Sequence, residues 1–244
     1  MGKNGETVGK QVEQFNINYK CKSESIRINQ TEIGKRFQNA IHIADSGPAN
    51  MGWRDVRTQL DKYMPVTDFP KILVIGCGIG SECYFAQKGG YDVTEITLSE
   101  YNYIFAKEQL GLERVYRADI HCTEFPDNFF DSALCYQTFE HFISPVLALV
   151  EIYRILRNHG ILLLELPPPQ FMSETMGGLS HILCPTPRQL KSLLEGTGFE
   201  IIEIFLYDSG IITEVMLDCC NQTFQVVCRK ELSHGLYSNI ILGR

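Results

Sequence analysis

The glycine-rich segment at residues 71–80 limits the folds open to this chain, because it joins an apolar strand pattern to a tight turn. It reads Lys-Ile-Leu-Val-Ile-Gly-Cys-Gly-Ile-Gly. Its aliphatic residues suit a strand that is buried on both faces of a parallel sheet. Gly76, Gly78 and Gly80 let backbone N–H groups approach a ligand that a Cβ atom would keep away. Ordinary strand-to-helix turns also use glycine, so two interpretations stay open here, a plain turn and a nucleotide-cofactor loop.

The residues after this segment continue the alternation of helices and strands. Helical patterns and short apolar strands follow one another at residues 81–88, 91–99, 100–109 and 113–118. A strand, a helix and a second strand in this order form a βαβ unit, in which the two strands are parallel. Ligands of such sheets bind beyond the carboxyl ends of the strands. We therefore expect functional side chains at the residues that directly follow each strand.

An acidic and aromatic turn is the most specific signal in the chain. Residues 124–131 read Glu-Phe-Pro-Asp-Asn-Phe-Phe-Asp, run into an apolar strand at 132–136 and are followed by Gln-Thr-Phe-Glu-His at 137–141. Together with the glycine-rich segment, this order resembles the small, single-domain class I S-adenosylmethionine-dependent methyltransferases. The similarity covers about residues 68–230. Residues 154–166 resemble the family's helix and turn into a fifth strand at 161–166, residues 185–190 and 198–199 resemble its last helix and the start of its sixth strand, and residues 223–229 would be the antiparallel seventh strand.

This resemblance implies an α/β fold, a doubly wound Rossmann-like sheet of seven strands that is mostly parallel with an antiparallel final strand. It also implies an N-terminal helical lid at residues 1–65, with a helix at 52–63, ahead of a methyltransferase domain at 66–232 and a C-terminal tail at 233–244. Such a lid closes over cofactor and substrate and excludes water. The polar composition of the first 29 or so residues leaves a disordered tail open as the alternative.

The same resemblance implies S-adenosylmethionine as the cofactor and assigns its contacts. The glycine loop would face the methionine portion, the end of the second strand the ribose, and the residues after the third strand the adenine. The expected contacts are Gly76, Cys77, Gly78, Gly80, Thr97, Leu98, Asp119, Ile120, Tyr136, Gln137 and, from the lid, Arg54. Asp119 is alternatively a turn cap, and Arg54 is alternatively part of a surface helix beside Trp53.

Two positions depart from the family pattern. Val74 stands where the family usually has a carboxylate two residues before the first glycine, and Thr97 stands where an acid usually holds both ribose hydroxyls. A hydroxyl cannot make the bidentate, charge-assisted contact of a carboxylate. Glu95 would have to reach forward by about 7 Å along the strand to replace it. These changes keep open a second function, that of a methyltransferase-like binding or scaffolding protein with weak or lost catalysis.

The expected reaction is transfer of a methyl group to an oxygen or nitrogen atom of a small-molecule acceptor. A hydroxyl acceptor needs a base that titrates near neutral pH, and histidine is the usual one. His141 follows the fourth strand, beside the expected methyl group, and is the first candidate. His181, in the segment after the fifth strand, is the second. The alternatives are a helix-start histidine that bonds only to the backbone and an ordinary connecting loop.

Charge and hydropathy limit the partners. The chain of 244 residues carries a formal net charge of −7 and has no basic cluster, so we expect no nucleic acid as substrate. It has no apolar run long enough to span a bilayer and no signal-peptide pattern, so we expect no membrane partner. The oligomeric state cannot be read from the sequence. A nicotinamide oxidoreductase is disfavoured because Ser81 occupies the place of the third glycine in a dinucleotide loop.

The nine cysteines raise the question of a metal or a disulfide. None of them forms a C-x-x-C pair, and several fall within or beside strands, where a thiol packs as a small apolar group. His181 and Cys184 with Cys219 and Cys220 form the best metal alternative, but adjacent cysteines are a poor tetrahedral set. We therefore expect no metal, and reduced thiols in a cytoplasmic setting.

Overall fold

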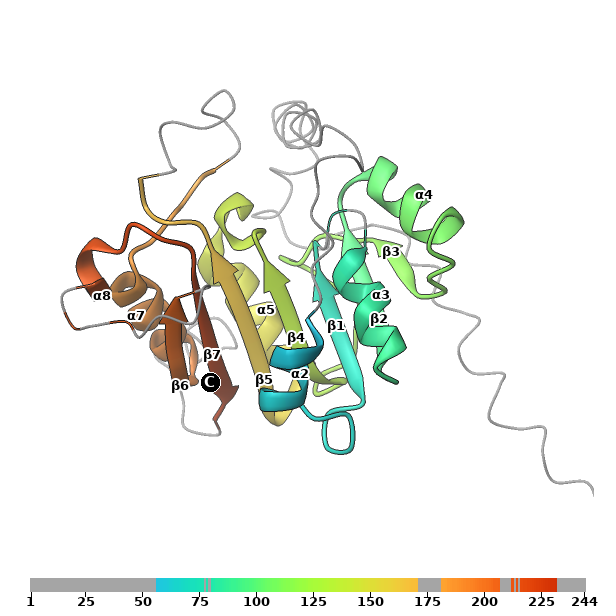
Figure 1. The fold of residues 1–244 in the computed structure, drawn as a ribbon, viewed down its shortest axis with the longest axis horizontal. Helices are drawn as coiled ribbons and strands as arrows, with labels where there is room; N and C mark the ends of the chain where they lie inside the picture. The colour runs from blue at the N-terminus through green and yellow to red at the C-terminus, as the bar shows by residue number, and fades with distance from the viewer. Residues whose placement is uncertain are drawn as a thin grey trace, which may run out of the picture.

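The computed structural model describes residues 56–76, 78, 80–170, 181–206, 212, 214 and 216–231 (Figure 1). Most of the expected lid and the whole of the expected tail at 233–244 lie outside the described residues. Within the described part, residues 56–64 pack against the rest of the fold, because Val56, Leu60 and Met64 are fully buried. The last stretch of the expected lid segment is therefore part of the core.

Seven strands form one sheet in the order β3-β2-β1-β4-β5-β7-β6. The strand β7 runs in the direction opposite to the other strands: it pairs antiparallel with β5 and β6, and the remaining pairs are parallel. This confirms the expected mostly parallel sheet with an antiparallel final strand. The strands are β1 (Lys71–Ile75), β2 (Asp92–Thr97), β3 (Val115–Arg117), β4 (Phe130–Tyr136), β5 (Leu156–Leu166), β6 (Phe199–Leu206) and β7 (Phe224–Lys230).

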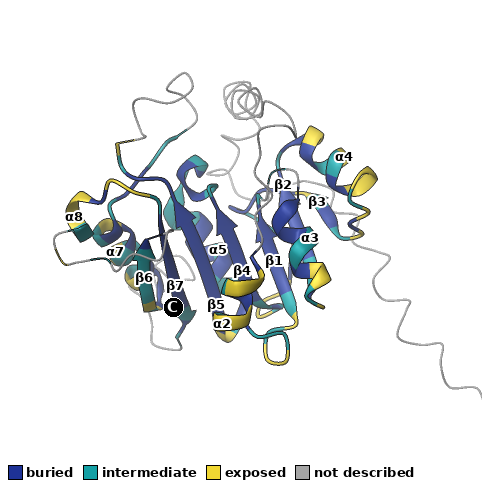
Figure 2. Ribbon diagram, viewed as in Figure 1, coloured by how far each residue is buried: buried dark blue, intermediate teal, exposed yellow. Residues whose placement is uncertain are grey.

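Helices cover both faces of the sheet, as a doubly wound fold requires. They are α2 (Arg57–Tyr63), α3 (Ser81–Lys88), α4 (Glu100–Glu108), α5 (Pro145–Ile155), α7 (Pro187–Thr197) and α8 (Met216–Cys219), with a 3₁₀ turn η2 (Phe139–His141). Figure 2 shows the buried strands between these helices, whose outer turns are exposed. Among the described residues, the structure contains no helix with the length and apolar character needed to cross a membrane.

Alternate residues of β1 enter two separate hydrophobic cores. Leu73 and Ile75 pack in the core that includes α5 and α7, whereas Ile72 and Val74 pack in the core that includes α2 and α3. This alternation follows from the pleat of a strand, which sends successive side chains to opposite faces. A strand buried on both faces explains the continuous apolar run of residues 72–75 in the sequence.

The fifth strand differs from its expected form. A turn was expected before a strand at residues 161–166, but β5 begins at Leu156, which pairs with Phe130 of β4. The pairing then shifts, and it resumes between Ile161 and Ser132. His159 takes a left-handed backbone with φ of 62° within this irregular stretch. The expected turn therefore lies inside a longer strand, as an irregular stretch in which residues 157–160 stand opposite Asp131 alone.

The strand order reverses direction at β1. From β1 the chain builds outward through β2 to β3, and β4 then starts on the other side of β1 and leads to β5. The loops after β1 and β4 therefore leave the same edge of the sheet in opposite directions. Open α/β sheets bind their ligands at such a switch point.

Candidate cofactor and acceptor site

The loop after β1 requires glycine at both of its ends. Gly76, Gly78 and Gly80 have φ values of 69°, 58° and 91°, a region in which other residues are strained. A Cβ atom on Gly76 would lie 2.4 Å from Cγ2 of Thr138, and one on Gly80 would lie 3.0 Å from Cδ1 of Leu110. Close protein packing therefore adds to the conformational reason for glycine. Cys77, which was expected to contact the cofactor, lies outside the described residues.

Residues at the end of β4 face this loop and are tied to β5. The single O–H of Thr138 lies within hydrogen-bond distance of the carbonyl oxygens of Gly76 (2.9 Å) and Tyr136 (2.8 Å) and is shared between them. Gln137 has a left-handed backbone with φ of 46°. Its backbone N–H donates to the carbonyl oxygen of Glu165 (2.9 Å), and its side-chain amide donates to Oε1 of Glu165 (3.0 Å). The strained turn after β4 is therefore held by Gly76 after β1 and by Glu165 of β5.

Thr97 ends β2 at the same edge of the sheet. It is buried, and its Oγ1 accepts a hydrogen bond from the backbone N–H of Ser99 (3.1 Å), so its own O–H remains able to donate one further bond. Leu98, the next residue, is half-buried. Glu95 is directed at α3 instead, where the thiol of Cys83 donates to its Oε2 (3.5 Å). This contact supports the expectation that Glu95 does not replace the missing acid.

Asp119 follows β3 and forms a buried pair with His121, which the sequence analysis did not single out. Oδ1 of Asp119 accepts from the backbone N–H of His121 (3.0 Å) and lies 2.5 Å from its Nδ1. Nε2 of His121 accepts from the backbone N–H of Ser144 (3.2 Å). Because Nε2 accepts a hydrogen bond and Nδ1 faces a carboxylate, we assign His121 as a neutral imidazole with its proton on Nδ1. An acid and a histidine two residues apart after a strand are the signal that could have identified the pair.

The neighbouring expected contacts are packed into the protein. Ile120 and Tyr136 are buried, with exposed fractions of 4% and 6%, and they enter different hydrophobic cores. Arg54, the expected partner of the methionine carboxylate, lies outside the described residues. The structure thus brings the loop after β1 together with the ends of β2, β3 and β4.

The two candidate catalytic histidines lie side by side. The ring centroids of His141 and His181 are 5.0 Å apart in an edge-on arrangement. The backbone N–H groups of Ile182 and Leu183 both donate to the carbonyl oxygen of Glu140 (2.7 and 3.2 Å), which fastens the segment after β5 to η2. Sγ of Cys184 lies 3.6 Å from Nδ1 of His181. Sequence reasoning named both histidines but could not show that they meet.

Glu140 is the third member of this group, and it was not proposed from the sequence. One ligand atom each of Glu140, His141 and His181 lies within 4.8 Å of the others. Glu140 is 1% exposed, and its Oε2 accepts no hydrogen bond from the residues that the structure describes. Burial raises the pKa of Glu140 to about 8, and the nearby charge of Glu165 acts in the same direction. Burial also raises the pKa of the Cys184 thiol to about 11, which keeps that thiol protonated at neutral pH.

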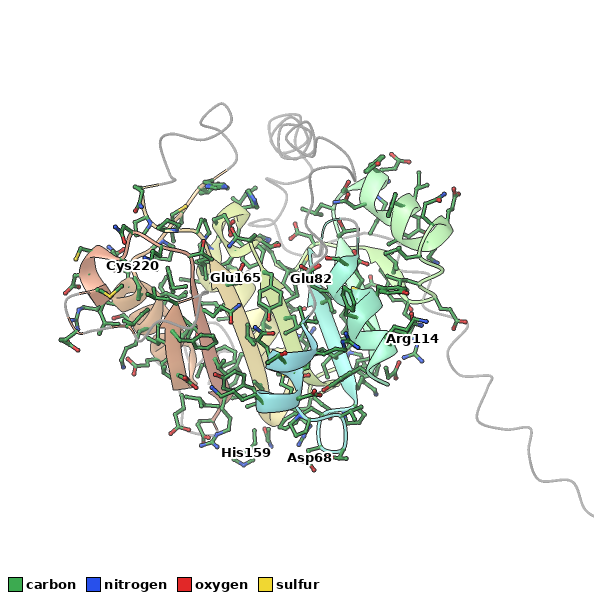
Figure 3. All side chains as sticks on the ribbon, in the orientation of Figure 1. Asp68, Glu82, Arg114, His159, Glu165 and Cys220 are labelled. Atoms are coloured by element: carbon green, nitrogen blue, oxygen red, sulfur yellow. The ribbon has the colours of Figure 1, made fainter. Side chains whose placement is uncertain are left out.

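Glu165 of β5 forms buried hydrogen bonds with two glutamine side chains near this group. Its carboxylate is fully buried and accepts from the side-chain amides of Gln137 (3.0 Å) and Gln225 (2.6 Å). Figure 3 places Glu165 and Glu82 toward one edge of the sheet and His159 at the opposite edge. Among the described residues, the grouping of Glu140, His141 and His181 is the only one with metal-ligand geometry, so Cys219 and Cys220 do not form the metal set weighed from the sequence.

The sheet order, the glycine loop at the switch point and the helices on both faces define a Rossmann-like methyltransferase fold. Residues 73–164 match the family model described as a methyltransferase domain. This part of the chain is therefore a methyltransferase domain, which supports an enzyme that uses S-adenosylmethionine as its cofactor. No curated protein matches the chain.

Solved structures share this fold at low sequence identity. A methyltransferase from Methanosarcina mazei has 17% identity and a TM-score of 0.59, over 74% of this chain and 100% of that one. A methyltransferase from Aquifex aeolicus has 17% identity and a TM-score of 0.59, over 79% and 97%. The cyclase SpnF has 20% identity and a TM-score of 0.58, over 82% and 93%.

Proposed function

We propose that this enzyme transfers a methyl group from S-adenosylmethionine to an oxygen or nitrogen atom of a small-molecule acceptor. The observation that carries this proposal is the placement of the paired rings of His141 and His181 at the strand edge that also holds the glycine loop. A cofactor loop and two imidazoles at one switch point suit a reaction in which positioning supplies most of the rate.

The residues at this edge fit the cofactor. The left-handed glycine loop would present its backbone to the methionine portion, although the N–H and carbonyl groups of Gly76 itself bond to Ile96 and Thr138. Thr97 can donate its single O–H to a ribose oxygen, which is a weaker contact than the usual carboxylate makes. We propose Leu98, Asp119, Ile120, Tyr136 and Gln137 as the remaining contacts, together with Cys77, Arg54 and the part of the lid before residue 56, which lie outside the described residues.

When bound, the cofactor supplies a methyl group on a sulfonium, so that an acceptor lone pair forms the new bond while the carbon–sulfur electron pair returns to sulfur. The acceptor loses a proton in this exchange. His141 and His181 are both half-buried, so each remains partly exposed to solvent. A neutral imidazole in such a position can accept that proton near neutral pH.

The charge of the chain favours a neutral or cationic small molecule as acceptor. Its net charge is −7, and a nucleic acid would meet net repulsion. The described cysteines are free thiols, which supports a reducing, cytoplasmic compartment. A small acceptor is also consistent with a site built from single side chains at strand ends rather than from an extended basic face.

A second candidate function is a methyltransferase-like protein with weak or lost catalysis. Val74 is 1% exposed and packs as an ordinary core residue where the family usually has an acid, and Thr97 replaces the ribose acid. The cyclase SpnF shares the fold, and its name is not that of a methyltransferase. Fold alone therefore does not decide whether methyl transfer is retained.

A binding panel followed by a transfer assay tests both functions. Calorimetry on the full chain should show binding of S-adenosylmethionine and of its demethylated product, and none of NADH. A panel of small alcohols, amines and sugars with isotope-labelled cofactor should then reveal transfer that His141→Ala slows by about 10² to 10⁴ at unchanged cofactor affinity. Binding without transfer to any acceptor would favour the second function, and NADH binding would contradict both.

A further inference from the structure

We propose that Glu140, His141 and His181 bind a divalent transition-metal cation, with Zn²⁺ as the best fit. One carboxylate oxygen and two imidazole nitrogens that lie within 4.8 Å of one another can reach a common ion with small side-chain movements. Two histidines and a carboxylate are an established donor set for Zn²⁺ and for other first-row divalent cations. From the sequence alone, no metal was expected in this protein.

The fold builds this group from two segments that are far apart in the chain. Glu140 and His141 belong to η2 at the end of β4, and His181 begins the stretch that leads to α7. The two backbone hydrogen bonds from Ile182 and Leu183 to the carbonyl oxygen of Glu140 hold these segments together. The backbone therefore sets the spacing of the three ligands, which is what a preorganised metal site requires.

Glu140 supplies an independent reason to expect a cation. Its side chain is 1% exposed, and Oε2 has no hydrogen-bond partner among the described residues. Buried carboxylates are normally paired, hydrogen-bonded or coordinated to a metal, because an isolated buried charge costs several kcal/mol. The nearby Glu165 carboxylate already accepts two amide hydrogen bonds and adds negative potential. A cation between Glu140 and the imidazoles would balance both carboxylates.

The contact between Cys184 and His181 orients one ring for this role. Sγ of Cys184 lies 3.6 Å from Nδ1 of His181, so we assign Nε2 of that ring to the cation. Metal-ligating histidines commonly have their other ring nitrogen held by a second group, which fixes the tautomer and the ring plane. Cys184 is thus a positioning residue, not a ligand.

The site also specifies the acceptor, a step that rests on the proposed function. Three protein ligands leave open positions on a tetrahedral or five-coordinate ion. The half-buried rings place these positions on the accessible side of the group. A bound cation would lower the pKa of a coordinated hydroxyl, so the acceptor would be an alcohol, phenol or enol that coordinates through oxygen and releases its proton to water. The two histidines would then be metal ligands, which replaces the role as base that the proposed function gives them.

Cobalt titration of the full chain tests the site directly. Protein stripped of metal with EDTA should bind one equivalent of Co²⁺, with visible d–d absorption typical of four or five ligands, and Zn²⁺ should displace it. Glu140→Gln and His181→Ala should each weaken Co²⁺ binding at least tenfold. His159→Ala, which removes an imidazole at the opposite edge of the sheet, should leave binding unchanged. His181→Asn replaces His181→Ala if the latter fails to fold.

The outcomes separate this site from the proposed function. Equal Co²⁺ affinity in the parent and in both ligand variants would overturn the metal site, and so would a strong thiolate-to-cobalt charge-transfer band, because a cysteine would then be the ligand. Calorimetry with S-adenosylmethionine on the same metal-free protein reports the cofactor loop alone. Cofactor binding without metal binding would remove only this inference. Metal binding without cofactor binding would remove the proposed function, and with it the acceptor assignment, but would keep the metal site.

Discussion

The Thr138 hydroxyl donates a hydrogen bond of 2.9 Å to the carbonyl oxygen of Gly76. This contact joins the loop after β1 to the turn after β4 at the switch point of the sheet. The same side chain fills the space beside Gly76, where a Cβ atom would lie 2.4 Å from Cγ2 of Thr138. The cofactor loop and the turn that leads to the histidines are therefore one packed unit, and a change in one should alter the other.

Gly76→Ala should destabilise the protein and weaken S-adenosylmethionine binding at least tenfold. The substitution adds a clash with Thr138 to the strain of a φ of 69°. We expect a loss of roughly 2 to 4 kcal/mol in the free energy of unfolding, measured by urea titration, because strain and overpacking each cost about 1 to 3 kcal/mol.

Gly111→Ala is the matched control for this substitution. Gly111 has a similar φ of 64°, but a Cβ atom there would meet nothing within 4 Å. It should lose only about 1 kcal/mol, from backbone strain, and should bind the cofactor normally. Equal losses in the two variants would show that packing against Thr138 is unimportant.

Thr97→Asp should tighten S-adenosylmethionine binding by up to about tenfold, since a carboxylate restores a charge-assisted contact with the ribose. The new side chain can still accept the N–H of Ser99, as the threonine oxygen does. Thr97→Asn keeps the shape and the acceptor without the charge, and calorimetry should show a smaller gain. A weaker affinity in the aspartate variant would place the ribose elsewhere.

Asp119→Asn should separate a structural role from a cofactor role. The amide oxygen can still accept both hydrogen bonds from His121, so the free energy of unfolding should change by less than about 1 kcal/mol. The adenine amine would lose a charged acceptor, so calorimetry should show weaker S-adenosylmethionine binding. Asp119→Ala, which leaves His121 without its partner, should cost about 1 to 3 kcal/mol of stability. Unchanged affinity in the asparagine variant would remove Asp119 from the adenine site.

Lys230 should make the protein more stable at alkaline pH. Burial lowers the pKa of Lys230 to about 8, from 10.5. Between these values the unfolded chain binds more protons than the folded protein, so the free energy of unfolding should rise with pH, by about 1 to 3 kcal/mol from Lys230. The neutral amine still has two N–H donors for the oxygens of Asn128 and Leu156.

Urea titrations at pH 7.5 and pH 10 measure this rise. Lys230→Met should flatten it relative to the parent, whereas Lys107→Met, at an exposed helix position, should not. A rise of the same size in the Lys230 variant would show that other groups cause it.

Local patterns predicted most of the fold because each strand carries its own signal. The apolar run at residues 72–75 and the acidic turn before β4 locate the centre of the sheet, and the final strand ends within one residue of its expected limit. The start of β5 was missed because it depends on pairing between Leu156 and Phe130, and no local pattern encodes that partner.

The candidate site was less predictable, for the same physical reason. His141 and His181 could be named from their positions after strands, but their contact depends on the hydrogen bonds that fasten residues 182 and 183 to Glu140. Glu140 was overlooked because its importance comes from burial, which a sequence motif does not report. The pairing of His121 with Asp119 has a local signal, but the hydrogen bond from Ser144 to its ring joins two distant segments and has none.

The place of β7 between β5 and β6 imposes an order on folding during synthesis. Among the described strands, β6 pairs with β7 alone, and β7 is synthesised after the other six. The strands that frame the glycine loop can therefore assemble early, while β6 waits without a partner until residues 224–230 emerge. A ribosome stalled before that point would hold the five strands β3-β2-β1-β4-β5 with an exposed β5 edge, a state that favours chaperone binding or aggregation.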